Sequence, residues 1–234
     1  MESYIVTLKS LLKHLFWLLI VYAVCRLLFY FFNYSYFSNV SIWQLLKIIV
    51  VSTRFDLSVI ILSNFLFIIL YLIPGPVREK KIYRGIVKWL FVIVNSIAVL
   101  ANCVDLAYFQ FTLKRTNATV FNFFSGELGN DLATLLPVFL RDYWYVFFIS
   151  AVLWYSIYYL YTKNEKSISL LWTRKQYGIQ FIIFILSSAL ALLAYRGGFQ
   201  LKPITVVSAG EYVSSKLIPL VINTPFSILK TFDV

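Results

Sequence analysis

Four charged side chains lie inside long apolar runs of the sequence: Arg26, Arg54, Asp56 and Asp105. A charge at the centre of a membrane helix costs about 2.5–3.5 kcal/mol on insertion scales, so such residues pair with one another or form a polar site. Arg54 and Asp56 are two residues apart and therefore point about 200° apart on one helix. Each needs a partner on another helix, and we expect Arg54 to pair with Asp105 and Arg26 with Asp56.

A polar face accompanies these charges on one predicted helix. Asn95, Asn102 and Asp105 have spacings that place them within an arc of about 80° on a helix, so they should face the interior of a bundle. Two readings remain open. The first is a structural network between helices, in which Arg26 only extends its charge to the interface. The second is a polar floor beneath the site of a lipid headgroup.

Further cations follow the apolar runs directly. Arg115, Arg196 and Lys202 are the candidates for binding a phospholipid headgroup, because a guanidinium or ammonium at a bilayer surface attracts phosphate. The alternative is ordinary interfacial anchoring. The aromatic stretch from Phe121 to Phe124 can cover such a site, with plain insertion into the interface as its alternative.

Residues for other chemistry are scarce. The single histidine, His14, lies beside an apolar run, and the two cysteines, Cys25 and Cys103, lie within such runs. The sequence contains no metal-ligand spacing, no glycine-rich phosphate loop and no nucleophile motif. We therefore predict no catalytic residue, no metal and no cofactor in this chain.

The composition shows what must position these residues. Of 234 residues, 61% are apolar and 13% are charged, whereas a soluble domain averages about 45–50% and about 25%. This excludes a soluble domain and predicts a membrane protein. The net charge of +11 arises from cations in short loops, which argues against nucleic acid as a partner.

Five apolar runs are long enough to cross a bilayer, which needs about 20 residues each. We expect an all-α, polytopic bundle of five transmembrane helices in residues 1–195, followed by an extracytoplasmic linker in residues 196–234. Short interfacial helices are expected at Leu132 to Leu140 and in the linker. In the linker, a capping box at Ser208 to Glu211 and an Asn223-Thr224-Pro225 start predict amphipathic segments on the outer surface. The predicted spans are Leu15 to Phe32, one within Ile48 to Ile73, Trp89 to Phe111, Tyr143 to Tyr161 and Tyr177 to Tyr195.

The orientation follows from the positive charges of alternate loops. One side collects eleven Lys and Arg residues and the other far fewer, so the first side is predicted to be cytoplasmic. With five spans the N-terminus then lies inside and the C-terminus outside.

Three stretches together resemble a known family: RFDLS from Arg54, VDLAYFQFTLKRTNATVF from Val104 and YRGGFQLKPI from Tyr195. They are similar to the N-terminal membrane domain of the lipoteichoic acid synthase-like family, in the sulfatase and alkaline phosphatase superfamily, whose architecture lipid A phosphoethanolamine transferases share. The resemblance implies a bacterial cytoplasmic membrane and a following extracytoplasmic catalytic domain. That domain would use a threonine and a divalent metal to move phosphoglycerol or phosphoethanolamine from a phospholipid.

The resemblance therefore implies the membrane anchor of a phospholipid-headgroup transferase, with membrane phospholipids and the missing catalytic domain as its partners. By itself the chain would be inert. The alternatives are a self-contained transporter or channel, or a membrane scaffold protein. The odd number of spans and the absence of inverted repeats argue against transport.

The predicted topology can be tested with a reporter that is active only outside the cytoplasm. Fused after Val234 it should be active, and inserted within Val77 to Arg84 it should be silent, because the cationic loops stay inside. The reverse pattern of activity would contradict the predicted orientation.

Overall fold

The computed structural model describes residues 2–121, 137–138, 140–165, 174–200 and 202–232, and all regular structure within them is helical. Four helices are long and apolar enough to cross a membrane, and a bent pair of helices forms a fifth crossing if it is counted as one span. The predicted all-α fold of a multi-pass membrane bundle is thereby confirmed. The single helices are α1 (Glu2–Phe32), α4 (Lys81–Thr112), α7 (Trp144–Asn164) and α8 (Arg174–Arg196), and the bent pair is α2 (Ile42–Ser63) with α3 (Phe65–Leu72).

The bend between α2 and α3 is 64° and falls at Asn64. The Asn64 side chain donates to the Ile60 carbonyl at 3.0 Å, and such local bonds compete with regular helix hydrogen bonding. Asn64 and Asn95 of α4 also exchange two side-chain hydrogen bonds, at 3.0 and 2.7 Å. The polar side chains at the break are therefore hydrogen-bonded inside the bundle.

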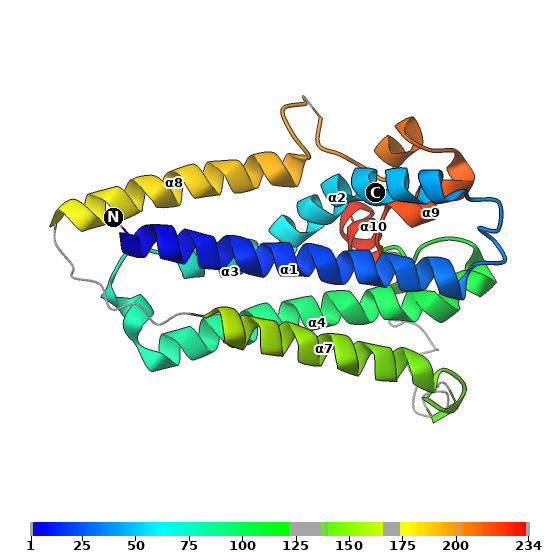
Figure 1. Ribbon diagram of the computed structural model, residues 1–234, viewed down its shortest axis with the longest axis horizontal. Helices are drawn as coiled ribbons and strands as arrows, with labels where there is room; N and C mark the ends of the chain where they lie inside the picture. Colours follow the sequence, from blue (N-terminus) through cyan, green and yellow to red (C-terminus); the bar gives the residue numbers. More distant parts are fainter. Residues whose placement is uncertain (1, 122–136, 139, 166–173, 201, 233–234) are drawn as a thin grey trace.

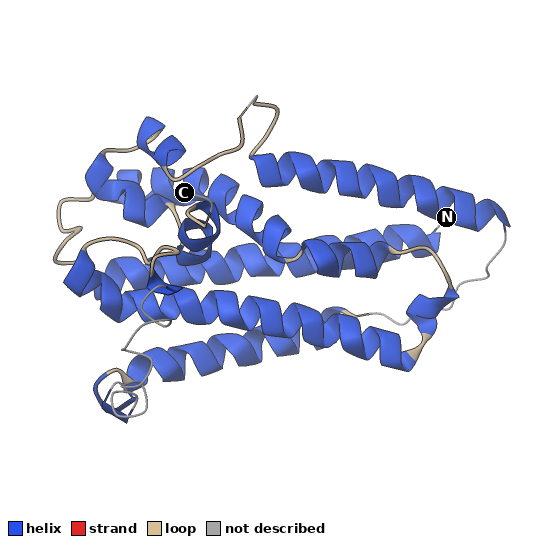
Figure 2. Ribbon diagram, turned by 180° about the vertical axis from the view of Figure 1, so that it is seen from behind, coloured by secondary structure: helices blue, strands red, loops and turns tan. Residues whose placement is uncertain are grey.

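Long segments that follow one another in the chain run in opposite directions along one axis (Figure 1). At one end Arg78, in the turn η1 (Pro76–Glu79), donates to Thr7, and Ser10 donates to the Asn164 carbonyl. The start of α1, the connection before α4 and the end of α7 therefore share this end. The segment after α8 lies at the opposite end, which we call the tail end, and Figure 2 shows the same arrangement from behind.

The core lies mainly between α1, α2 and α4. Helix α4 packs against α7 and α1, whereas α8 packs mainly against α2 and α3. The predicted polar face of α4 is buried as expected, because Asn95, Asn102 and Asp105 are at most 3% exposed. Much of α7 and α8 is exposed and apolar, as expected of helices that face lipid.

The segment after α8 departs from the prediction. Its elements are η2 (Val207–Glu211), η3 (Ser215–Leu217), α9 (Ile218–Val221) and α10 (Thr224–Lys230). The expected capping box is wrong, because the Ser208 hydroxyl accepts from the Thr205 amide and only a 3-10 turn follows. The expected surface position is also wrong for residues 220–227, which are all buried.

This burial has a simple origin in the sequence. The run Ile218-Pro219-Leu220-Val221-Ile222 carries no charge, and α9 and α10 pack on α2, with α10 also on α4. The predicted start of α10 is confirmed, because the Asn223 side chain accepts from the Phe226 amide at 2.8 Å and Pro225 occupies the first turn. The predicted helix at Leu132 to Leu140 falls mostly outside the described residues, as do residues 122–124.

Candidate functional site

The centre of the tail end is a buried ion pair between α1 and α2. Arg26 donates to both carboxylate oxygens of Asp56 at 2.7 Å, and each residue is 2% exposed. This two-point geometry is the strongest form of the arginine–carboxylate pair. The predicted partnership of Arg26 and Asp56 is confirmed, so Arg26 does not extend to the interface.

The tail completes the hydrogen bonding of this pair. Arg26 also donates to the carbonyls of Leu220 at 2.8 Å and Val221 at 3.1 Å, at the end of α9. The side-chain amide of Asn223 donates a hydrogen bond to Asp56 Oδ1 at 2.6 Å. Carbonyls at a helix end have no partner within the helix, and here the guanidinium supplies one.

A second pair lies beside the first. Arg115 Nη1 is 3.6 Å from Asp105 Oδ2, and the Thr224 hydroxyl donates to the same carboxylate at 2.6 Å. Thr116 donates its amide and its hydroxyl to Asp105. The Thr224 amide donates to Asn102 Oδ1 at 3.1 Å, so the tail contacts the polar face of α4 directly.

A sharp turn after α4 makes this second pair possible. Leu113 has φ of +54°, a left-handed conformation that costs a non-glycine residue roughly 1–2 kcal/mol. The turn directs the Arg115 side chain back toward Asp105 of α4. Its guanidinium carbon lies 3.4 Å from the centre of the Phe29 ring of α1. Burial lowers the pKa of Arg115 to about 10, so the guanidinium stays charged at neutral pH.

The predicted pairing of Arg54 with Asp105 is wrong. Arg54 donates instead to the Gly197 carbonyl at 2.5 Å, to the Tyr212 hydroxyl at 2.5 Å and to Gln200 Oε1. Gly197 has φ of +80°, and an added Cβ would lie 2.7 Å from Ile204. The glycine is therefore required for the loop that brings its carbonyl to Arg54.

We use the name buried charge network for the two ion pairs and the tail and α4 side chains that bind them. Its members are Arg26, Asp56, Asn102, Asp105, Arg115, Thr116, Asn223 and Thr224. The two guanidinium and two carboxylate charges cancel, as a low-dielectric site requires. Sequence reasoning missed Arg115, Thr116, Asn223 and Thr224 as members, and the only signal was the uncharged run that precedes Asn223.

The three cations proposed for headgroup binding do not form one site. Arg115 is buried and donates to the Pro219 carbonyl and the Thr224 hydroxyl, so its guanidinium already has partners within the protein. Arg196 is half-buried and donates to the Gln200 carbonyl at 3.1 Å. Lys202 is exposed in the loop after α8.

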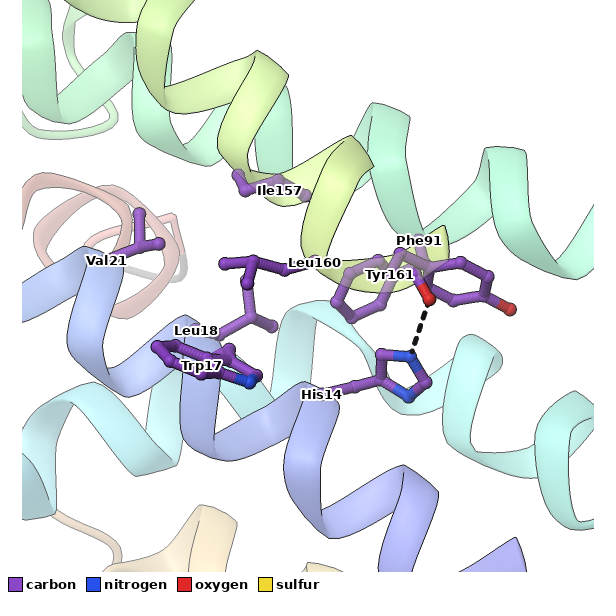
Figure 3. A pocket seen from close by; sticks show the side chains of 8 residues that line it. All are labelled: His14, Trp17, Leu18, Val21, Phe91, Ile157, Leu160 and Tyr161. Atoms are coloured by element: carbon purple, nitrogen blue, oxygen red, sulfur yellow. Dashed lines mark hydrogen bonds between the residues drawn. The ribbon is translucent and has the colours of Figure 1, made fainter. Parts of the chain in front are cut away.

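His14 lies in an aromatic cluster toward the opposite end (Figure 3). Its ring stacks on Tyr161 at 4.5 Å between centroids, and Nε2 lies 3.5 Å from the Tyr161 carbonyl. The adjoining cavity of about 10 Å³ has about the volume that one water molecule needs. Among the described residues no three His, Cys, Asp or Glu side chains gather as a metal site.

Comparison of the chain with family models, with curated proteins and with solved structures gave no significant match.

The network predicts strong coupling between Arg26 and Asp56. Arg26→Ala or Asp56→Ala alone should lower the free energy of unfolding in detergent by about 3–5 kcal/mol, because each leaves a buried charge without its partner. The double substitution should recover part of the loss.

A matched pair provides the control for this experiment. Arg54→Ala and Asp105→Ala remove residues that share no hydrogen-bond partner, so their losses should add to within about 0.3–0.5 kcal/mol. Additive losses for Arg26 and Asp56 would contradict the described pairing.

Proposed function

We propose that this chain is the membrane anchor domain of a sulfatase-superfamily phospholipid-headgroup transferase. It lies in the bacterial cytoplasmic membrane with its N-terminus inside and its C-terminus outside, and it holds the lipid donor at the outer leaflet. Residues 196–234 connect the anchor to an extracytoplasmic catalytic domain of the parent protein. That domain supplies the divalent metal.

One observation carries the proposal: the tail is fixed to the buried charge network. Residues 220–227 are buried, and six hydrogen bonds join Leu220, Val221, Asn223 and Thr224 to Arg26, Asp56, Asn102, Asp105 and Arg115. A flexible tether would need none of them. A linker that holds a catalytic domain at a set height above its lipid substrate gains from a rigid attachment, because positioning a reactant lowers the entropic part of the barrier.

The bundle itself supports the anchoring role. Its long helices are apolar, and most of its buried polar side chains at the tail end bind one another instead of lining an open path. Transporters typically place broken helices around a binding site near the bilayer midplane. Here the broken pair α2–α3 closes its break with the amide pair of Asn64 and Asn95.

The proposal predicts the lipid product that the parent protein releases. Transfer of phosphoglycerol or phosphoethanolamine from a phospholipid leaves diacylglycerol, so a strain without the gene should release less labelled diacylglycerol from labelled phospholipid. The parent protein should restore the release, and the variant Asn223→Ala/Thr224→Ala should restore clearly less at equal membrane level. These two substitutions remove the side-chain bonds from the tail to Asp56 and Asp105.

Ser214→Ala is the control variant, because it truncates an exposed tail side chain that makes no capping hydrogen bond at the start of η3. It should restore diacylglycerol release as the parent does. Unchanged release in the strain without the gene would contradict the transferase proposal. Equal restoration by all variants would contradict the role of the fixed tail.

A further inference from the structure

A cavity of about 290 Å³ lies at the tail end of α4, beside the turn at Leu113. Its volume is at the lower end of the range of about 300–1,000 Å³ found for ligand pockets. The polar residues that line it come from the last turns of α4 and the segment that follows: Tyr108, Thr112, Lys114, Arg115, Thr116, Asn117 and Thr119. It is therefore a small polar cavity on a membrane helix.

The charge around this cavity is positive. Lys114 is exposed, and no described residue forms an ion pair with its ammonium group. Asp105, the nearest carboxylate in sequence, is 0% exposed and binds Thr116, Thr224 and Arg115 behind the cavity wall. Arg115 also lines the cavity, but Asp105 offsets its charge, so Lys114 sets the sign of the potential in the cavity.

The cavity also lies at the end of a helix that is long and apolar enough to cross a membrane. Helix α4 ends at Thr112, and Tyr108 and Phe111 in its last turns are 37% and 72% exposed. Aromatic side chains gather where the hydrocarbon core meets the headgroups. A lipid whose acyl chains flank Phe111 would therefore have its phosphate beside Lys114.

We propose that this cavity binds the phosphodiester headgroup of an anionic phospholipid, with the Lys114 ammonium as its cationic ligand. A zwitterionic headgroup such as ethanolamine would need a carboxylate for its own ammonium, and none lines the cavity among the described residues. Phosphatidylglycerol therefore fits better than phosphatidylethanolamine. This site deepens the proposed function and rests on it, because only the outward tail end faces the outer leaflet.

The test measures binding of fluorescent phosphatidylglycerol to the purified full chain in phosphatidylcholine nanodiscs. Lys114→Ala should raise the dissociation constant about fivefold, because one positive charge near a membrane surface changes lipid affinity by about that factor. Lys114→Arg keeps the charge and should retain the affinity. Lys47→Ala is the control, since Lys47 is an exposed cation in the first half of α2 and does not line the cavity.

Binding that does not depend on Lys114 would overturn the proposal, and so would three further outcomes. Equal weakening by Lys47→Ala and Lys114→Ala would show only surface attraction. Equal binding of phosphatidylethanolamine would contradict the anionic preference. Displacement of the lipid by inorganic phosphate at equal concentration would show an inorganic anion site. Lys114 is exposed, so all variants should keep the thermal stability of the parent chain.

The lipid assay separates this proposal from the proposed function. If binding does not depend on Lys114 while diacylglycerol release depends on the gene, the cavity assignment is wrong and the anchor proposal stands. If release does not depend on the gene while Lys114 binds phosphatidylglycerol, the transferase proposal is wrong.

Discussion

The ion pair between Arg26 and Asp56 is the constraint on which the tail end of the bundle depends. Both charges lie in apolar helices, where an unpaired charge is costly and even a paired one must satisfy its remaining hydrogen-bonding groups. Helices α1 and α2 supply the charges but not all of the partners. The carbonyls of Leu220 and Val221 and the amide of Asn223 supply the rest, so the position of the tail follows from the ion pair.

The second pair ties the same segment to α4. Arg115 and Asp105 both bind Thr224. The Thr224 hydroxyl donates a hydrogen bond to the Asp105 carboxylate and accepts one from the Arg115 guanidinium. The two ion pairs thus hold residues 219–224 from three helices at once. Arg54 binds the loop after α8 through Gly197 and Gln200, so the bundle holds the start of this segment as well as residues 219–224.

Much of this could be predicted from the sequence, because insertion into a membrane leaves few choices. Run length and hydropathy predicted the crossings, and helical spacing predicted the buried face of Asn95, Asn102 and Asp105. The same reasoning paired Arg26 with Asp56 correctly. The same reasoning failed for Asp105, because its partner Arg115 lies after the end of α4. The left-handed turn at Leu113 that brings Arg115 back is not indicated by the residue type, since leucine rarely adopts this conformation. The reasoning also failed for the tail. The apolar run of residues 218–222 is too short to cross a membrane and was expected to lie on the surface, but the buried charges of the bundle bind it in the interior.

Hydrogen exchange of the tail amides tests the fixed linker most directly. The amides of Thr224, Phe226 and Ser227 bind Asn102, Asn223 and the Asn223 carbonyl, so they should exchange as slowly as the buried turns of α2. The stretch before η3, in which Gly210, Glu211 and Ser214 are exposed, should exchange much faster. If residues 222–227 exchanged as fast as that stretch, the tail would be a loose tether and its attachment to the buried charge network would be refuted.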